Sequence, residues 1–260
     1  MEEWAMRRGN EIMSRDIERA RRFLRETFEN EVERGRSTVP AHFASLVADH
    51  SERVGEIASW IADAEGLPVN QLRLAGILHD VKKLAANIPG GIVSPVIHAD
   101  RGKVEAVHFL TEDLHKSDEL SIAISCMINA HSATPLSKDA LNLETPDTPE
   151  EWALRDANML DYLDFWGMAM EVGFRQHPGT FGYKRDKGNI VESIGFARSM
   201  RIKYSKGLHG ETAKKIGMIL RRRGSRFVLF MSGKTISNIE DFRAVLNEFI
   251  ATEFIYTPPS

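Results

Sequence analysis

Apolar residues recur along most of this 260-residue chain at the three- and four-residue spacing of amphipathic helices. The clearest example is the segment 42–64, whose apolar stripe is followed by the helix-ending residues Gly66 and Pro68. The same spacing, read together with capping residues, predicts further helices at 11–33, 69–84, 102–115, 118–130, 190–204, 210–223 and 239–254, and one that begins at Pro149. The sequence therefore predicts an all-α fold.

Glycine and proline mark the segments between these helices. We expect loops at 86–100 and 132–148, a long loop or lid at 173–189, and a short strand at 226–231. The predicted organisation has three parts, which are an N-terminal amphipathic helix at 1–36, a helical domain at 37–172, and a lid loop with a helical extension at 173–260 that packs on the same domain.

The overall composition is that of a soluble globular protein, with 42% hydrophobic and 27% charged residues. A net charge of -3 gives no general attraction to nucleic acid or to a membrane surface. The chain lacks both an apolar run of roughly 20 residues and the apolar core of a signal peptide. We expect a cytoplasmic protein that binds neither membranes nor nucleic acid.

A basic run interrupts this balance at 201–226, where nine lysines and arginines are opposed only by Glu211. We interpret the run as a solvated helix face, which is the common structure behind such patterns. The alternative is a surface that attracts an anionic ligand.

Ionisable residues lie on the apolar faces of four predicted helices: His50, His79 with Asp80, His131 and Asp156. A single inward histidine is usually a core residue with a backbone partner. Several such residues together are harder to explain, because a buried, unpaired carboxylate costs several kcal/mol. A shared cation would remove that cost. The adjacent pair His79–Asp80 points about a third of a turn apart on a helix, so two cations could share Asp80.

The donor atoms available in the sequence narrow the choice of metal ion. The only cysteine, Cys126, lies in an apolar run, where we expect a buried, inert thiol and no thiolate ligand. Imidazole and carboxylate donors suit Fe, Mn, Co, Ni or Zn, and suit Mg less well.

Five short motifs carry a family resemblance. "HSERV" contains His50, "LAGILHDVKK" contains the doublet, "HADRG" contains His98, "INAHSATP" contains His131, and "LRDANMLDYLD" contains Asp156. In this order they resemble the HD-domain superfamily of metal-dependent phosphohydrolases, over residues 41–166. The doublet alone is a weak signal, whereas the ordered set is specific. The two additional histidines are similar to those of the subgroup with binuclear sites, which includes enzymes that act on nucleotides.

The resemblance implies an HD-domain helical bundle that holds two divalent or mixed-valence metal ions. His50, His79, Asp80 and Asp156 would hold the first ion. His98 and His131 would hold the second, with Asp80 bridging. A hydroxide bound to both ions would then attack a phosphoryl group.

Three residues are the candidate catalytic groups: Asp80, Lys83 and Arg53. Lys83 completes the "HDxxK" form of the doublet, and its ammonium could pair with a substrate phosphate or with the leaving group. Arg53, one turn after His50, is a second candidate for the same role. We expect Asp161 on the helix surface or behind the ligands.

The predicted function is hydrolysis of a nucleotide or another small phosphate ester, so the expected partner is a small anionic molecule. The alternative is an HD-domain diiron oxygenase that cleaves a small organic substrate with O₂, because such enzymes resemble the hydrolases at all six ligand positions. A degenerate domain that only binds a nucleotide is disfavoured, since no ligand position is missing. The charged N-terminal helix is a candidate arm of a homodimer.

Overall fold

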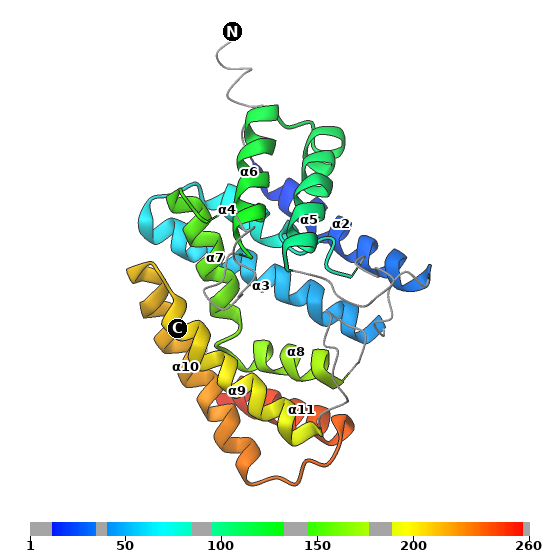
Figure 1. Ribbon diagram of the computed structural model, residues 1–260, viewed down its shortest axis with the longest axis vertical. Coiled ribbons are helices and arrows are strands. Elements are labelled where there is room, and N and C mark those ends of the chain that lie inside the picture. The colour runs from blue at the N-terminus through cyan, green and yellow to red at the C-terminus, as the bar shows by residue number, and fades with distance from the viewer. Residues whose placement is uncertain (1–11, 35–40, 85–94, 133–144, 177–188, 257–260) are drawn as a thin grey trace.

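The computed structural model describes residues 12–34, 41–84, 95–132, 145–176 and 189–256. Within these ranges the chain forms helices and no strand, which confirms the all-α prediction (Figure 1). The elements are α2 (Ser14–Glu33), α3 (Ala41–Glu65), α4 (Val69–Leu78), α5 (Pro95–His108), the π-helical turn η1 (Phe109–Asp113), α6 (Asp118–Ala130), α7 (Pro149–Asp161), α8 (Phe165–Gln176), α9 (Ile190–Gly207), α10 (Glu211–Ser232) and α11 (Ile239–Tyr256).

The described helices share two apolar clusters. The larger cluster joins α2 to α7 and also includes Met170 of α8 and Ala213 and Leu220 of α10. The smaller one joins α8, α9, α10 and α11 around the fully buried rings of Phe165, Phe227 and Phe242. Burial of each such ring stabilises the fold by about 1.5–3 kcal/mol. Figure 1 shows α8 to α11 at one end of the molecule, beyond α3 and α7. The predicted domain boundary between residues 172 and 173 falls inside α8, which spans Phe165–Gln176.

Helices α3 and α4 touch through their backbones. A Cβ atom added to Gly76 would lie 2.5 Å from the Cα atom of Gly55, and one added to Gly55 would lie 2.8 Å from the carbonyl oxygen of Arg73. Only glycine permits so close an approach. The crossing places His50, which lies in α3, near His79, which directly follows the end of α4.

Helix α7 begins as its sequence predicts. The side chain of Thr148 accepts a hydrogen bond from the backbone N–H of Glu151, and the Glu151 carboxylate accepts one from the Thr148 N–H. Pro149 occupies the first turn, where its missing N–H costs nothing. This capping box fixes the start of a helix that is buried along most of its length.

Three expectations about element boundaries need correction. Helix α4 ends at Leu78, so the doublet lies in the turn after the helix and not inside it. Helix α5 begins at Pro95, so His98 lies on a helix and not in the expected loop 86–100. The expected strand at 226–231 is instead part of α10, where Phe227 and Met231 face the core one turn apart.

The expected lid and loop are only partly visible. Residues 173–176 of the lid belong to α8, while residues 177–188 lie outside the described ranges. Of the expected loop 132–148, residues 133–144 also lie outside them.

Cys126 is exposed, which corrects the expectation of a buried thiol. Helix α6 turns Ile124, Met127 and Ile128 to the core, and Cys126 falls on its other side together with the exposed Ile122. An apolar run in a helix contains more apolar positions than the buried face requires, and periodicity does not show which of them are exposed.

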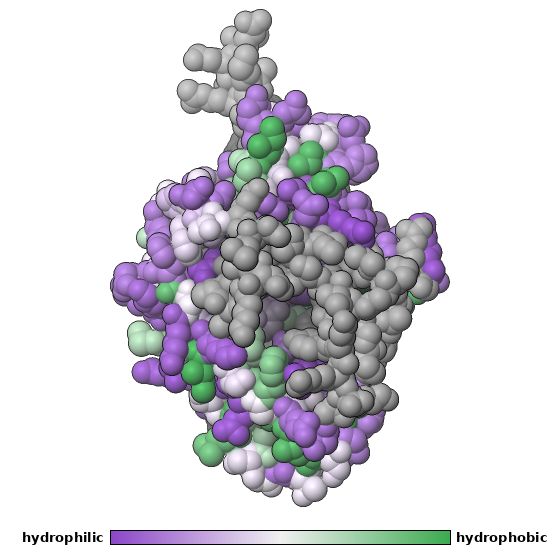
Figure 2. Space-filling view, viewed as in Figure 1, coloured by the Kyte–Doolittle hydropathy of each residue, from purple (hydrophilic) through white to green (hydrophobic). Residues whose placement is uncertain are grey.

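Most of the basic run is solvated, as expected. Seven of its nine cationic side chains are exposed on α9 and α10: Lys203, Lys206, Lys214, Lys215, Arg221, Arg222 and Arg226. The two exceptions are Arg223, which is partly buried and pairs with Asp164 at 3.2 Å, and Arg201. Arg201 is buried and donates hydrogen bonds to the carbonyl oxygens of Leu163 and Arg221 at 3.0 and 2.8 Å. On the face drawn in Figure 2 the described surface is mainly polar, with small separate hydrophobic areas. No helix in the described ranges is long and apolar enough to cross a membrane.

Candidate metal centre

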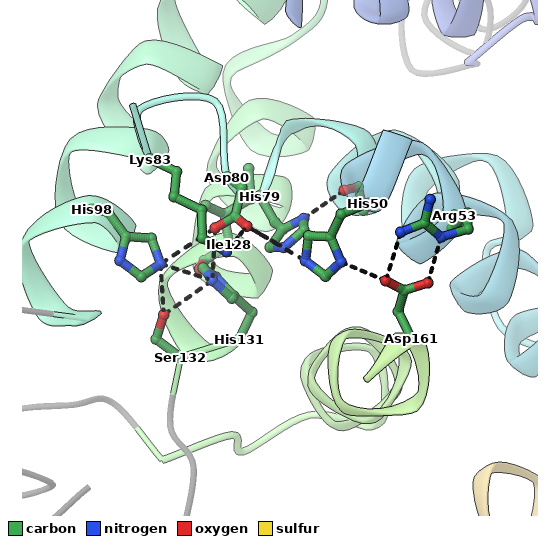
Figure 3. Close-up of polar contacts among 11 residues, drawn as sticks. His50, Arg53, His79, Asp80, Lys83, His98, Ile128, His131, Ser132 and Asp161 are labelled. Atoms are coloured by element: carbon green, nitrogen blue, oxygen red, sulfur yellow. Dashed lines mark hydrogen bonds and ion pairs between the residues drawn. The ribbon is translucent and has the colours of Figure 1, made fainter. Parts of the chain in front are cut away.

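Four segments bring one acid and four histidines together in the core (Figure 3). His50 comes from α3, the His79–Asp80 doublet from the turn after α4, His98 from α5, and His131 from the end of α6. Every one of these side chains is buried, with His98 the most accessible at 8%. Their donor atoms form two groups able to hold a metal ion, His50–His79–Asp80 and Asp80–His98–His131. Within each group these atoms lie within 4.8 Å of one another.

Asp80 belongs to both groups and presents a different oxygen atom to each. Its Oδ2 atom lies 3.5 Å from Nε2 of His50 and 3.2 Å from Nε2 of His79. Its Oδ1 atom lies 3.3 Å from Nε2 of His98 and 3.7 Å from Nε2 of His131. A carboxylate placed in this way can bridge two cations.

The imidazole rings are held in the orientation that a metal ligand needs. Nδ1 of His79 lies 2.7 Å from the carbonyl oxygen of Gly76, and Nδ1 of His131 contacts that of Ile128. A carbonyl oxygen can only accept, so each Nδ1 carries the proton. The lone pair of each neutral ring is then on Nε2, which points toward Asp80.

Among the described residues, several donor atoms in the centre have no hydrogen-bond partner. These buried atoms are Nε2 of His50, Nε2 of His79 and Oδ1 of Asp80. Each buried polar atom left unpaired costs about 1–3 kcal/mol. A cation in each group would use these lone pairs, and nitrogen and oxygen donors without sulfur suit Mn, Fe, Co, Ni or Zn. The described residues therefore fit divalent metal ions.

The pKa values agree with a neutral-imidazole, anionic-carboxylate ligand set. Burial lowers the pKa of His79 and lowers that of His131 well below its usual value. Burial alone would raise the pKa of Asp80, but His79 and Lys83 hold it well below its usual range. The protonation states required of metal ligands are thus the ones this environment favours.

The structure does not bring Asp156 to the centre. Its carboxylate accepts hydrogen bonds from the backbone N–H groups of His209 at 3.0 Å and Gly210 at 2.7 Å. Both residues precede Glu211, the first residue of α10, so Asp156 holds the turn that leads into that helix. The α7 side chain that reaches the centre is Asp161, five residues later, which places it about 140° around the helix from Asp156.

Asp161 meets the outer nitrogen of a ligand. Its Oδ2 atom lies 2.7 Å from Nδ1 of His50. Arg53 donates to the same carboxylate, from Nε to Oδ1 at 2.7 Å and from Nη2 to Oδ2 at 3.0 Å. Figure 3 shows Arg53 and Asp161 on the far side of His50 from Asp80, so Arg53 does not reach the group of ligands.

Lys83 lies where the sequence predicts. Its ammonium contacts Oδ2 of Asp80, and the side chain is largely buried. Of the two cationic candidates, Lys83 and Arg53, Lys83 is the one that contacts a member of the centre.

Two further polar groups were missed in the sequence. The hydroxyl of Ser132 lies 3.0 Å from Nε2 of His131 and 3.3 Å from Nε2 of His98. On α7, the side-chain oxygen of Asn158 is buried without a hydrogen-bond partner, one turn before Asp161. Both lie next to residues that the motifs identify, but serine and asparagine are common in loops and helices and give no signal of their own.

The comparisons with known proteins agree with this arrangement. The HD-domain family matches residues 47–163, a range that includes all five residues of the two metal-binding groups. No curated protein sequence matches the chain.

Two solved structures share the fold. Bacillus subtilis YpgQ, crystallised in complex with ADP, is 15% identical, with 82% of this chain and 94% of that chain covered and a TM-score of 0.51. An HD-superfamily hydrolase from Bacillus thuringiensis is 19% identical, with 83% and 94% covered and a TM-score of 0.50. At these identities the likeness concerns the fold. The family match and the arrangement of the histidines and Asp80 identify residues 47–163 as an HD domain.

Proposed function

We propose that this protein is a metal-dependent phosphohydrolase that acts on a nucleotide or another small phosphate ester. The observation that carries the proposal is the position of Asp80, whose two oxygen atoms face two different pairs of buried histidine nitrogens. Two neighbouring cations lower the pKa of a bound water molecule and neutralise the charge that develops on a transferred phosphoryl group. Such a pair suits phosphate hydrolysis better than any single ion.

The protein residues would bind and orient the ions. His50, His79 and Asp80 would hold the first, and Asp80, His98 and His131 the second. The Nδ1 contacts prevent the rings of His79 and His131 from turning, so little reorganisation accompanies binding. The deep burial of the ligands keeps bulk water away from the reacting groups.

The accessible side of the centre indicates where a substrate would bind. Lys83 and His98 retain 8% of their exposure and Ser132 retains 6%, whereas His50 and His79 retain none. A phosphate that approaches past Lys83 would meet its ammonium, a compact positive charge on a flexible stem. Lys83 is therefore the side chain that we assign to substrate phosphate, as in the "HDxxK" motif. Arg53 is not assigned this role, because it lies on the far side of His50 from Asp80 (Figure 3).

Nucleotides are the first substrate class to test. The fold is shared with YpgQ, which was crystallised in complex with ADP. A small anionic substrate also suits a centre that combines cations with a lysine.

The experiment is a phosphate-release assay on the full chain, with Mn²⁺ or Co²⁺, a panel of nucleotides and a generic phosphate ester. Oxygen uptake in the presence of iron is measured in parallel. We expect metal-dependent release that is lost in Asp80→Asn, with no oxygen consumption. Oxygen consumption without phosphate release would contradict the proposed hydrolase function and favour the diiron oxygenase.

A further inference from the structure

The two metal-binding groups differ in the partners that the Nδ1 atoms of their histidines contact. In the first group, Nδ1 of His50 meets the carboxylate of Asp161 at 2.7 Å. In the second group, the partner of Nδ1 of His131 within the described ranges is the backbone carbonyl of Ile128 in its own turn. A carboxylate behind a ligating histidine orients the ring and makes its other nitrogen a better donor than a neutral carbonyl does.

Asp161 is itself held on both oxygen atoms. Arg53 forms a bidentate pair with the Asp161 carboxylate, with Nε donating to Oδ1 at 2.7 Å and Nη2 donating to Oδ2 at 3.0 Å. The guanidinium in turn lies over the ring of Trp166, 5.5 Å from its centre. Asp161 retains only 1% of its exposure, so its carboxylate has no freedom to turn toward water. The contacts thus form a continuous chain from Trp166 through Arg53 and Asp161 to His50. Figure 3 shows its part from Arg53 to His50.

We propose that Asp161 and Arg53 are positioning residues that tighten the first metal site, formed by His50, His79 and Asp80, and leave the second site unchanged. The inference rests on the proposed function only in that both sites take divalent cations. It follows that the two sites differ in affinity and that the first site fills first.

The test is a titration of the metal-free full chain with Mn²⁺, followed by calorimetry and by electron paramagnetic resonance. The wild type should bind two ions with different affinities. Asp161→Asn, which keeps the shape of the side chain, should weaken the tighter site by about 10- to 100-fold, the usual effect of removing such a partner. The weaker site should keep its affinity. Arg53→Gln should weaken the tighter site less than Asp161→Asn does, because the Asp161 carboxylate loses the contact that orients it while its uncompensated charge attracts the cation.

A double variant separates position from charge. Asp161→Asn alone leaves the positive charge of Arg53 near the first site, which by itself would repel a cation. Arg53→Gln combined with Asp161→Asn removes both charges and restores the wild-type balance. Weakening that persists in the double variant therefore comes from the lost contact with His50.

Asp164→Asn is the matched control. Asp164 is also a buried carboxylate, one turn beyond Asp161, and it pairs with Arg223 at 3.2 Å. We expect both metal affinities to be unchanged in this variant, while thermal unfolding of every metal-free variant shows that the fold is kept.

Two results would overturn the inference. One is equal weakening of both sites in Asp161→Asn, and the other is no weakening at all. A wild type that binds neither Mn²⁺ nor Co²⁺ overturns it together with the proposed function. A wild type that binds metal as described but releases no phosphate overturns the proposed function alone.

Discussion

Gly55 and Gly76 bring helices α3 and α4 into backbone contact, since a Cβ atom on Gly76 would lie 2.5 Å from Cα and 2.7 Å from N of Gly55. The contact lies a few residues after His50 in α3 and a few residues before His79, which directly follows α4. The carbonyl oxygen of Gly76 also receives the Nδ1 proton of His79. Packing and metal-site geometry therefore depend on the same position.

Gly76→Ala should destabilise the protein by about 1–3 kcal/mol, because the helices must separate to admit a methyl group. Urea unfolding of the metal-free protein measures the loss. The control is Gly195→Ala on α9, where an added Cβ meets no atom within 4 Å. That variant should gain about 0.5–1 kcal/mol from the better helix propensity of alanine. Equal stability of Gly76→Ala and the wild type would contradict the backbone contact.

Asp156→Ala should lower stability and leave metal content unchanged. The variant removes the acceptor for the N–H groups of His209 and Gly210, just before α10, a loss worth about 1–3 kcal/mol. Metal analysis of the purified protein, together with denaturant unfolding, separates the two effects. Loss of a bound ion would return Asp156 to the ligand set.

Lys83→Met should slow phosphate release at least about tenfold if the ammonium supplies one charge-assisted contact to the substrate, since such a contact is worth about 1.5–3 kcal/mol. Bound metal should remain. The neighbouring Lys82 offers a matched control, because it pairs with Glu105 at 3.0 Å and does not contact the ligands. If Lys82→Met and Lys83→Met slow release equally, the assignment of Lys83 to the substrate is wrong.

Asp164 should make the folded protein less stable as the pH rises from about 4 to 6. Burial raises the pKa of this carboxyl from 3.8 to about 6, despite the opposing effect of Arg223. Between these values the folded state holds a proton that the unfolded state has released, so stability falls with increasing pH. Urea unfolding of the metal-free protein at pH 4, 5, 6 and 7 should show a shallower decline in Asp164→Asn. Parallel curves for the two proteins would contradict the raised pKa.

The helices and most of the candidate ligands could be predicted from the same signal. The apolar stripe that indicates each helix also indicates which of its ionisable residues face the core. His50, His79 and His131 lie on stripes that face a single core, so the sequence pattern places them correctly. The position of His98 was predicted by its motif alone, because the glycines and prolines of its segment concealed the start of α5 at Pro95.

Helix α7 shows where periodicity fails. It is buried on nearly every side, with α3 packed on one face and the start of α10 on another. A helix buried all round has no single inward stripe, so the pattern does not distinguish Asp156 from Asp161. Residues 226–231 present the same problem in another form, because a short apolar run fits a buried helix as well as a strand.

Diffraction from crystals grown with Mn²⁺, recorded where manganese scatters anomalously, tests the shared role of Asp80 most directly. The account predicts two peaks per chain that flank the Asp80 carboxylate, one beside His50 and His79 and the other beside His98 and His131. A single peak, a peak at Asp156, or no peak near Asp80 at saturating Mn²⁺ would contradict it.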